Sequence, residues 1–271
     1  MRYPAVILRS FVDFFRDGGL MLAASISFFT MMALVPFCLF LVTLFGYVLG
    51  ENREFYQFFL SKLVGFFPKI TSEITEELKR IITYKGIGKF TLAVYSVISF
   101  GLFSAIETSI NTIFRTKERR LFIISLILSV IIVTCVMSAV FISFGTASAV
   151  SMLKHLREFF PGCEPGRVSG FLLQFVVPLL LVFLVILTLY WVLPRKKVTL
   201  SHALSGALFT ALFLDAAKHL FTFYVVRVAR LGTIYGPLSA FVIFLLWVFY
   251  SSCIFLIGAE MVRNLGTSKG R

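Results

Sequence analysis

Long runs of apolar residues without charges dominate the hydropathy pattern of this 271-residue chain. A run of about 18 or more such residues predicts a membrane-spanning helix, because a span needs about 20 residues to cross the hydrocarbon core. Two further apolar segments carry charges at their edges or inside. We therefore expect six spans, at approximately residues 20–48, 90–112, 121–150, 168–193, 199–226 and 234–259.

The first connection between spans is the longest. Residues 51–88 carry apolar side chains at helix-like intervals, with charged residues between them. This pattern predicts an extracytoplasmic amphipathic loop. Near the N-terminus, residues 6–16 show a similar pattern and predict a short helix that lies in the membrane interface. The chain is thus expected to be an all-α, polytopic integral membrane protein. Residues 1–271 would form a single membrane domain with six transmembrane helices and additional amphipathic interfacial helices.

Composition supports a membrane protein and limits its partners. Hydrophobic residues make up 59% of the chain and charged residues only 14%, whereas soluble chains carry about 25% charged residues. The net charge of +13 comes from Lys and Arg scattered through every loop, without the one-faced stripe typical of nucleic-acid binding. Membrane phospholipids are therefore the expected partners, and no nucleic acid is expected. The Cys and His spacings predict no metal and no cofactor.

The short basic connections predict the orientation in the membrane. Arg115–Arg120 follows the second predicted span and Arg195–Lys197 follows the fourth. Short loops rich in Lys and Arg stay in the cytoplasm. Both termini are therefore expected to be cytoplasmic in a multi-pass protein. The first loop opposes this orientation, because it places basic residues outside, but it is longer and also carries acidic residues.

Ionisable residues inside the fifth predicted span are the main candidate for a functional site. Asp215 precedes Lys218 by three residues and His219 by four, so all three lie on adjacent parts of one helix face. Charges at bilayer depth each cost about 2.5–3.5 kcal/mol and normally face a protein interior or an aqueous cavity. Glu107 and Asn111, at the end of the second span, could join them in an intramembrane polar site. The trio is either a neutralised set that fastens helices together or a polar element of a transport pathway.

The last predicted span adds a second candidate site. Tyr235 and Gly236 open it, and a helix N-terminus at this point could hold an anionic head group. Alternatively, Tyr235 belongs to an aromatic belt at the interface, and Trp247, near mid-span, serves packing. Glu260 is expected at the cytoplasmic interface, with Arg263 as its partner three residues later on the same helix face.

Several motifs resemble those of the BrkB/YihY family of bacterial inner-membrane proteins. The segments that carry the resemblance are Ala24–Thr30, Leu34–Pro36, Ile110–Phe114, Ser205–Phe221, Ile234–Ala240, Leu246–Tyr250 and Gly258–Glu260. Pro36, Trp247, Gly258 and Glu260 are family-motif residues among them. One departure is visible, since relatives often have Trp-Glu where this chain has Leu214-Asp215. The resemblance implies a location in the bacterial inner membrane.

The resemblance implies little about activity. The family was formerly labelled ribonuclease BN, a label regarded as a misassignment, and some relatives have been connected with envelope lipid transport. This sequence contains no hydrolytic or nucleotide-binding signature, so no enzyme activity is expected. We expect a transporter or lipid-handling protein of the cell envelope that uses a polar intramembrane groove. A homodimer would suit such a groove. The alternative is a structural or scaffolding envelope protein that transports nothing.

Overall fold

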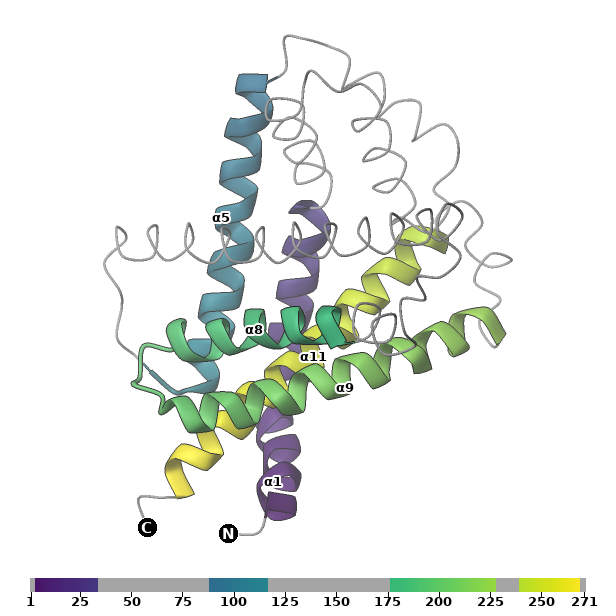
Figure 1. Cartoon of the computed structure of the whole chain (residues 1–271). Helices are drawn as coiled ribbons and strands as arrows, with labels where there is room; N and C mark the ends of the chain where they lie inside the picture. The colour runs from purple at the N-terminus through teal and green to yellow at the C-terminus, as the bar shows by residue number, and fades with distance from the viewer. Residues whose placement is uncertain (1–2, 34–87, 117–175, 228–238, 269–271) are drawn as a thin grey trace, which may run out of the picture. The chain divides into compact units, whose positions relative to one another are not determined.

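The described part of the protein is entirely helical. The computed structural model describes residues 3–33, 88–116, 176–227 and 239–268 (Figure 1), and these contain no strand. The labelled helices are α1 (Tyr3–Arg16), α5 (Gly88–Ile113), α8 (Val177–Val192), α9 (Leu200–Arg227) and α11 (Ser239–Ser268). A further apolar helix spans Gly19–Ala33. The expected all-α class is therefore confirmed for these residues.

The N-terminal helix α1 is amphipathic and separate from the apolar helix that follows it. Val6, Ser10 and Phe14 recur at four-residue intervals and are buried on one face. The opposite side exposes apolar residues such as Leu8, as suits a helix at the boundary between head groups and acyl chains. Gly18, with φ of 73°, ends α1, because this left-handed conformation favours glycine over residues with a Cβ.

Two of the described helices are long and apolar enough to cross a membrane. They are Leu200–Phe221 within α9 and Phe241–Thr267 within α11, and Gly19–Ala33 and Pro178–Val192 are shorter apolar helices. The count of six spans therefore stays a prediction. Several predicted features lie outside the described residues. They are the span at 121–150, the loop at 51–88 up to residue 87, and the residues Pro36, Tyr235 and Gly236.

The helix α11 extends beyond the point at which the last span was predicted to end. We placed this end at residue 259, before the first charge, whereas α11 continues to Ser268. The physical reason is that Glu260 and Arg263 form an ion pair with each other, with 2.7 Å between Oε2 and Nη2. Paired charges do not oblige a helix to end. The fifth span was predicted at 199–226, and the helix α9 covers Leu200–Arg227.

The chain divides into two compact units, which are described separately. The first contains the described residues within Met1–Gly19, Ser109–Lys218 and Ile254–Arg271, and the second those within Leu20–Thr108 and His219–Cys253. In the second unit, the ring of Trp247 on α11 lies 5.3 Å from that of Phe221 on α9, and Tyr250 also contacts both rings. Packing is therefore the role that the structure shows for Trp247.

In the first unit, α8, α9 and α11 cross closely at small residues. The Tyr190 hydroxyl of α8 donates a hydrogen bond to the Phe255 carbonyl of α11 and lies 2.9 Å from the Thr210 hydroxyl of α9. A Cβ on Gly258 would overlap both Thr210 and Tyr190. Glycine and other small residues allow such close approach of membrane helices. Gly258, a family-motif residue, is therefore required by the crossing of three helices.

Candidate functional site

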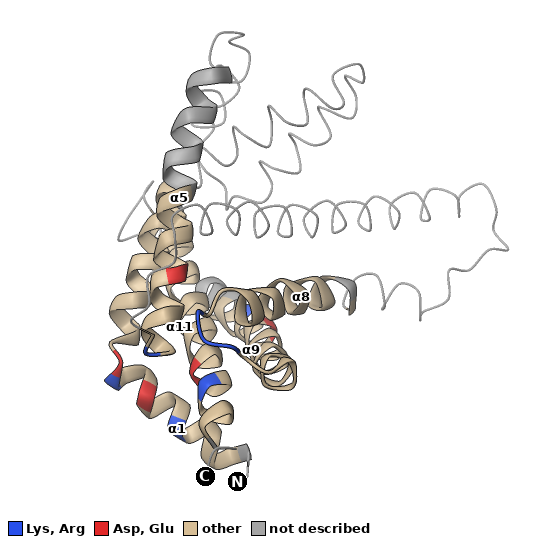
Figure 2. Ribbon diagram, turned by 90° about the vertical axis from the view of Figure 1, so that its left-hand side faces the viewer, with Lys and Arg blue, Asp and Glu red and all other residues tan. Residues whose placement is uncertain are grey.

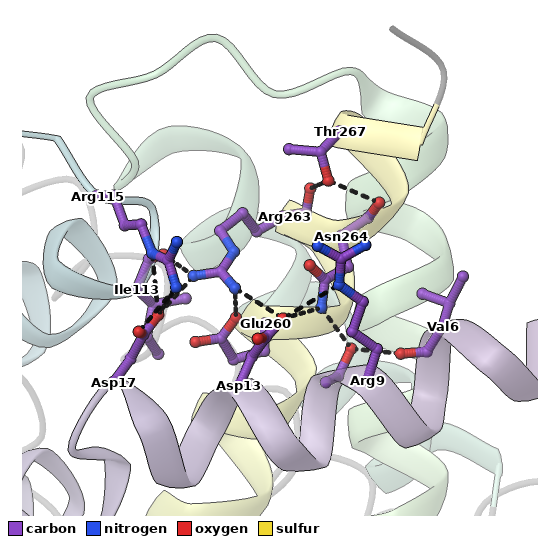
Figure 3. Close-up of polar contacts among 11 residues, drawn as sticks. Val6, Arg9, Asp13, Asp17, Ile113, Arg115, Glu260, Arg263, Asn264 and Thr267 are labelled. Atoms are coloured by element: carbon purple, nitrogen blue, oxygen red, sulfur yellow. Dashed lines mark hydrogen bonds and ion pairs between the residues drawn. The ribbon is translucent and has the colours of Figure 1, made fainter. Parts of the chain in front are cut away.

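A buried cluster of charges joins α1 to the C-terminal part of α11 (Figure 3). Arg263 of α11 lies at its centre. Its Nη1 is 2.6 Å from the Asp17 carboxylate, and its Nη2 is 3.0 Å from the carboxylate of Asp13. The same Nη2 lies 2.7 Å from Glu260, which confirms the contact expected three residues apart. Asp13 and Asp17 meet the same guanidinium because residues four apart share one side of a helical turn.

Further polar groups complete this cluster, which we call the α1–α11 charge cluster. Arg115, in the turn after α5, donates two hydrogen bonds from Nη2 to the Asp17 carboxylate, at 2.9 and 3.1 Å. The amide of Asn264 donates to Asp13 at 3.0 Å and to the Ser10 hydroxyl at 3.2 Å. Arg263 also donates to the Ile113 carbonyl at 2.8 Å. Charge-assisted bonds of this kind fix geometry as well as contributing energy.

Three carboxyl groups and three guanidiniums meet in this cluster. The three carboxylates of Asp13, Asp17 and Glu260 face the guanidiniums of Arg263, Arg115 and Arg9, the last of which lies 3.6 Å from Asp13. Partial burial opposes ionisation of Asp17, but the hydrogen bonds and charges of Arg115 and Arg263 outweigh it and hold the pKa of this carboxyl below its ordinary value. The hydrogen bond and charge of Asp17 correspondingly raise the pKa of Arg115. Such a set is suited to fastening helices together.

The sequence-predicted polar site lies on α9 and α5. Asp215 is half-buried on α9, whereas Lys218 and His219 are exposed. Glu107 and Asn111 are both buried on α5. The Oδ1 of Asn111 accepts hydrogen bonds from the Arg195 backbone N–H at 3.0 Å and from the Thr116 hydroxyl at 3.1 Å. Asn111 thus holds the turn between α8 and α9. Its grouping with Asp215 stays a prediction.

Sequence reasoning missed most of the α1–α11 charge cluster. The spacing of Asp13 and Asp17 on an amphipathic helix was a usable signal, because such a pair places two carboxylates on one face. The partner of these two carboxylates could not be identified from the sequence, because Arg263 lies 246 residues beyond Asp17 in the chain. Only the local contact of Glu260 with Arg263 followed from spacing alone.

Comparisons with known proteins agree with the motifs of the sequence. The family model described as Virulence factor BrkB matches residues 10–269. The UPF0761 membrane protein of Aliivibrio salmonicida is 29% identical over 253 residues, which cover 91% of this chain and 78% of the relative. The UPF0761 membrane protein of Azotobacter vinelandii is 30% identical over 271 residues, which cover 96% of this chain and 62% of the relative.

A third relative shows how far the similarity extends along both chains. The UPF0761 membrane protein of Haemophilus influenzae is 25% identical over 250 residues, covering 90% of this chain and 88% of the relative. No solved structure matches the chain. The family match covers nearly all of the sequence, and the relatives are named membrane proteins from bacteria. The chain therefore belongs to the BrkB family of bacterial membrane proteins.

Proposed function

We propose that this protein handles lipids of the bacterial envelope and moves them past polar groups on α9. The observation that carries the proposal is the presence of Asp215, Lys218 and His219 within a 28-residue, largely apolar helix. All three residues lie inside the stretch that is long enough to cross a membrane, Leu200–Phe221. Because each such charge costs about 2.5–3.5 kcal/mol at bilayer depth, a compensating polar partner or aqueous path is required.

The surroundings of the trio support a cargo with both polar and apolar parts. Lys218 and His219 are exposed on α9, beside large exposed apolar side chains that include Leu220 and Phe223. The charged head group of an amphiphilic lipid could contact Lys218 and His219, and its acyl chains could contact the exposed apolar side chains. The trio would thus supply the polar side of a groove, in a protein that acts without a cofactor and without catalysing a reaction.

A scaffolding role is the second candidate. The α1–α11 charge cluster favours it, because partly buried ion pairs hold helices in a fixed arrangement without needing a ligand. Such pairs specify structure more than they add stability. In a scaffold, the charged residues of α9 would also hold helices together, by pairing with charges on other helices or on a second copy of the protein.

The proposed location is the inner membrane, with both termini in the cytoplasm. The contact of α1 with the C-terminal end of α11, through Asp13, Asn264 and Arg263, supports placing both ends of the chain on the same side. The basic turn at Arg195–Lys197 belongs to the same unit and favours the cytoplasmic side. A homodimer remains part of the proposal, since six spans are few to enclose a groove.

Lipid movement in proteoliposomes tests the proposed function. Purified protein is reconstituted into vesicles that contain a fluorescent phospholipid, and a membrane-impermeant quencher reports exchange between the leaflets. We expect exchange at least about tenfold faster than in protein-free vesicles, because a polar path lowers the cost of carrying a head group through hydrocarbon. Exchange equal to that of protein-free vesicles, from protein shown to be folded, would favour the scaffold.

A further inference from the structure

A pocket of about 350 Å³ lies where α9 begins and α11 ends. Its wall combines the turn before α9, the first residues of α9 and the last turns of α11. The described residues that line it are Phe114, Lys196, Lys197, Val198, Thr199, His202, Val262, Arg263, Gly266 and Thr267. We call this cavity the basic pocket. All of its lining residues belong to the first compact unit.

The charge of the basic pocket is positive and is not neutralised by its own wall. Lys196 and Lys197 are exposed, and no ion pair to either is made by the residues that the structure describes. The charge of Arg263 is different, since Asp13, Asp17 and Glu260 already surround it. Arg263 therefore forms part of the wall, whereas the two lysines supply the surplus charge. No acidic residue is among the described lining residues.

The start of α9 adds backbone donors to these lysines. The N–H groups of His202 and Ala203 donate to the Thr199 carbonyl, which marks Thr199 as the residue at the helix start. The first N–H groups of a helix have no partner within the helix, and its dipole favours an anion there. Lysine ammonium groups combined with a helix N-terminus are a recurrent arrangement for phosphate. Figure 2 shows Lys and Arg positions, in blue, on the turn that leads into α9.

The depth of the pocket in the membrane can also be inferred. The apolar stretch of α9 starts at Leu200 and that of α11 ends at Thr267, and both ends border the pocket. Two stretches long enough to cross the bilayer thus terminate here together. In a bilayer crossed by these two stretches, the pocket would lie at the level of the lipid head groups, where basic pockets between membrane helices bind anionic heads.

We propose that the basic pocket binds a phosphate group, carried either by an anionic phospholipid or by a phosphorylated solute. The proposal goes beyond the proposed function, because a protein that moves no lipid would bind phosphate here in the same way. The site is also separate from Asp215, Lys218 and His219, which lie farther along α9. Loss of one site therefore need not abolish the other.

Binding is measured on the full chain, purified in a neutral detergent and stripped of lipid. Native mass spectrometry reports how much added phosphatidylglycerol or phosphatidylcholine remains bound, and inorganic phosphate and glycerol 1-phosphate serve as soluble competitors. We expect phosphatidylglycerol to bind in preference to phosphatidylcholine. The variant K196Q/K197Q should weaken phosphatidylglycerol binding about 30-fold, because each lysine near an anionic head group contributes about 1 kcal/mol.

Two further variants separate the pocket from general surface charge. R16Q removes a positive charge from an exposed position of α1 and should retain binding within about twofold. Gly266→Leu changes no charge but places a side chain in the pocket, where its Cβ meets only the His202 Nδ1 at 3.8 Å. This variant should weaken binding about as much as K196Q/K197Q. It also provides the test if the lysine variant fails to fold.

Each result supports or overturns the proposal. If binding is lost in both pocket variants and retained in R16Q, the proposal is supported, with a lipid as the source of the phosphate. If phosphatidylglycerol shows no preference but the soluble phosphates bind with this same variant dependence, the source is a solute. Equal losses in R16Q and K196Q/K197Q, or no loss in either pocket variant, would overturn the proposal. Slow exchange in the proteoliposome test leaves these outcomes unaffected.

Discussion

Replacing Arg263 by leucine should destabilise the protein by about 3–5 kcal/mol, because removing one partner of a buried ion pair leaves uncompensated charges. Only 9% of the Arg263 side chain is exposed, and it faces three carboxylates. Glu260 would lose its counter-charge while fully buried. Unfolding by a denaturing detergent in mixed micelles, followed by circular dichroism, measures the change in free energy.

Arg115→Leu is the matched control for this prediction. It removes a guanidinium from the same cluster, but 55% of the Arg115 side chain is exposed, and exposed pairs contribute about 0–1 kcal/mol. Arg263→Lys should recover only part of the stability, because an ammonium cannot reproduce the forked geometry that contacts Asp13 and Asp17 together. If Arg263→Leu cost no more than Arg115→Leu, the buried position of the cluster would be contradicted.

Replacing Gly258 by leucine should cost about 2–3 kcal/mol through overpacking of the crossing between α8, α9 and α11. A Cβ at this position already overlaps the Thr210 hydroxyl and the Tyr190 hydroxyl. The Tyr190 side chain is fully buried and cannot move into open space. The same detergent titration measures the loss, and thermal unfolding should show a lower midpoint.

Gly266→Leu is the control on the same helix. The Cβ there meets only the His202 Nδ1, at ordinary van der Waals distance, and leucine has a higher helix propensity than glycine by about 1 kcal/mol. Its stability should therefore equal or exceed that of the parent. Equal stabilities for the Gly258 and Gly266 variants would show that the three helices do not cross at Gly258.

The fold was predictable from the sequence where the signal was local. The bounds of α9 followed from the basic turn at Arg195–Lys197 and from the apolar run after it. The end of α11 did not follow, because a single sequence shows the charges of Glu260 and Arg263 but not that they neutralise each other and meet α1. A hydropathy rule counts each charge as unpaired, so it says nothing about how far the helix continues past the apolar run.

The candidate sites were also difficult to predict where they depend on contacts between segments far apart in the sequence. The motif around Gly258 identified the residue, whereas the reason for a glycine there depends on Tyr190 of another helix. The basic pocket joins residues 196–202 to residues 262–267, and nothing in either segment alone indicates the other. Asp215 and Lys218 stood out because charges in an apolar run are costly, which is a property of the segment itself.

The most direct test of lipid handling is the rate of phospholipid exchange in proteoliposomes that contain the double variant Asp215→Leu/Lys218→Leu. Replacing both charges of a coupled pair by apolar residues can leave stability nearly unchanged, whereas either single replacement leaves the other charge in the apolar helix. We predict a double variant that folds and inserts like the parent, with lipid exchange reduced to the rate of protein-free vesicles. Exchange by this variant at the parental rate would contradict the account, because the polar groups of α9 would then serve only to hold helices together.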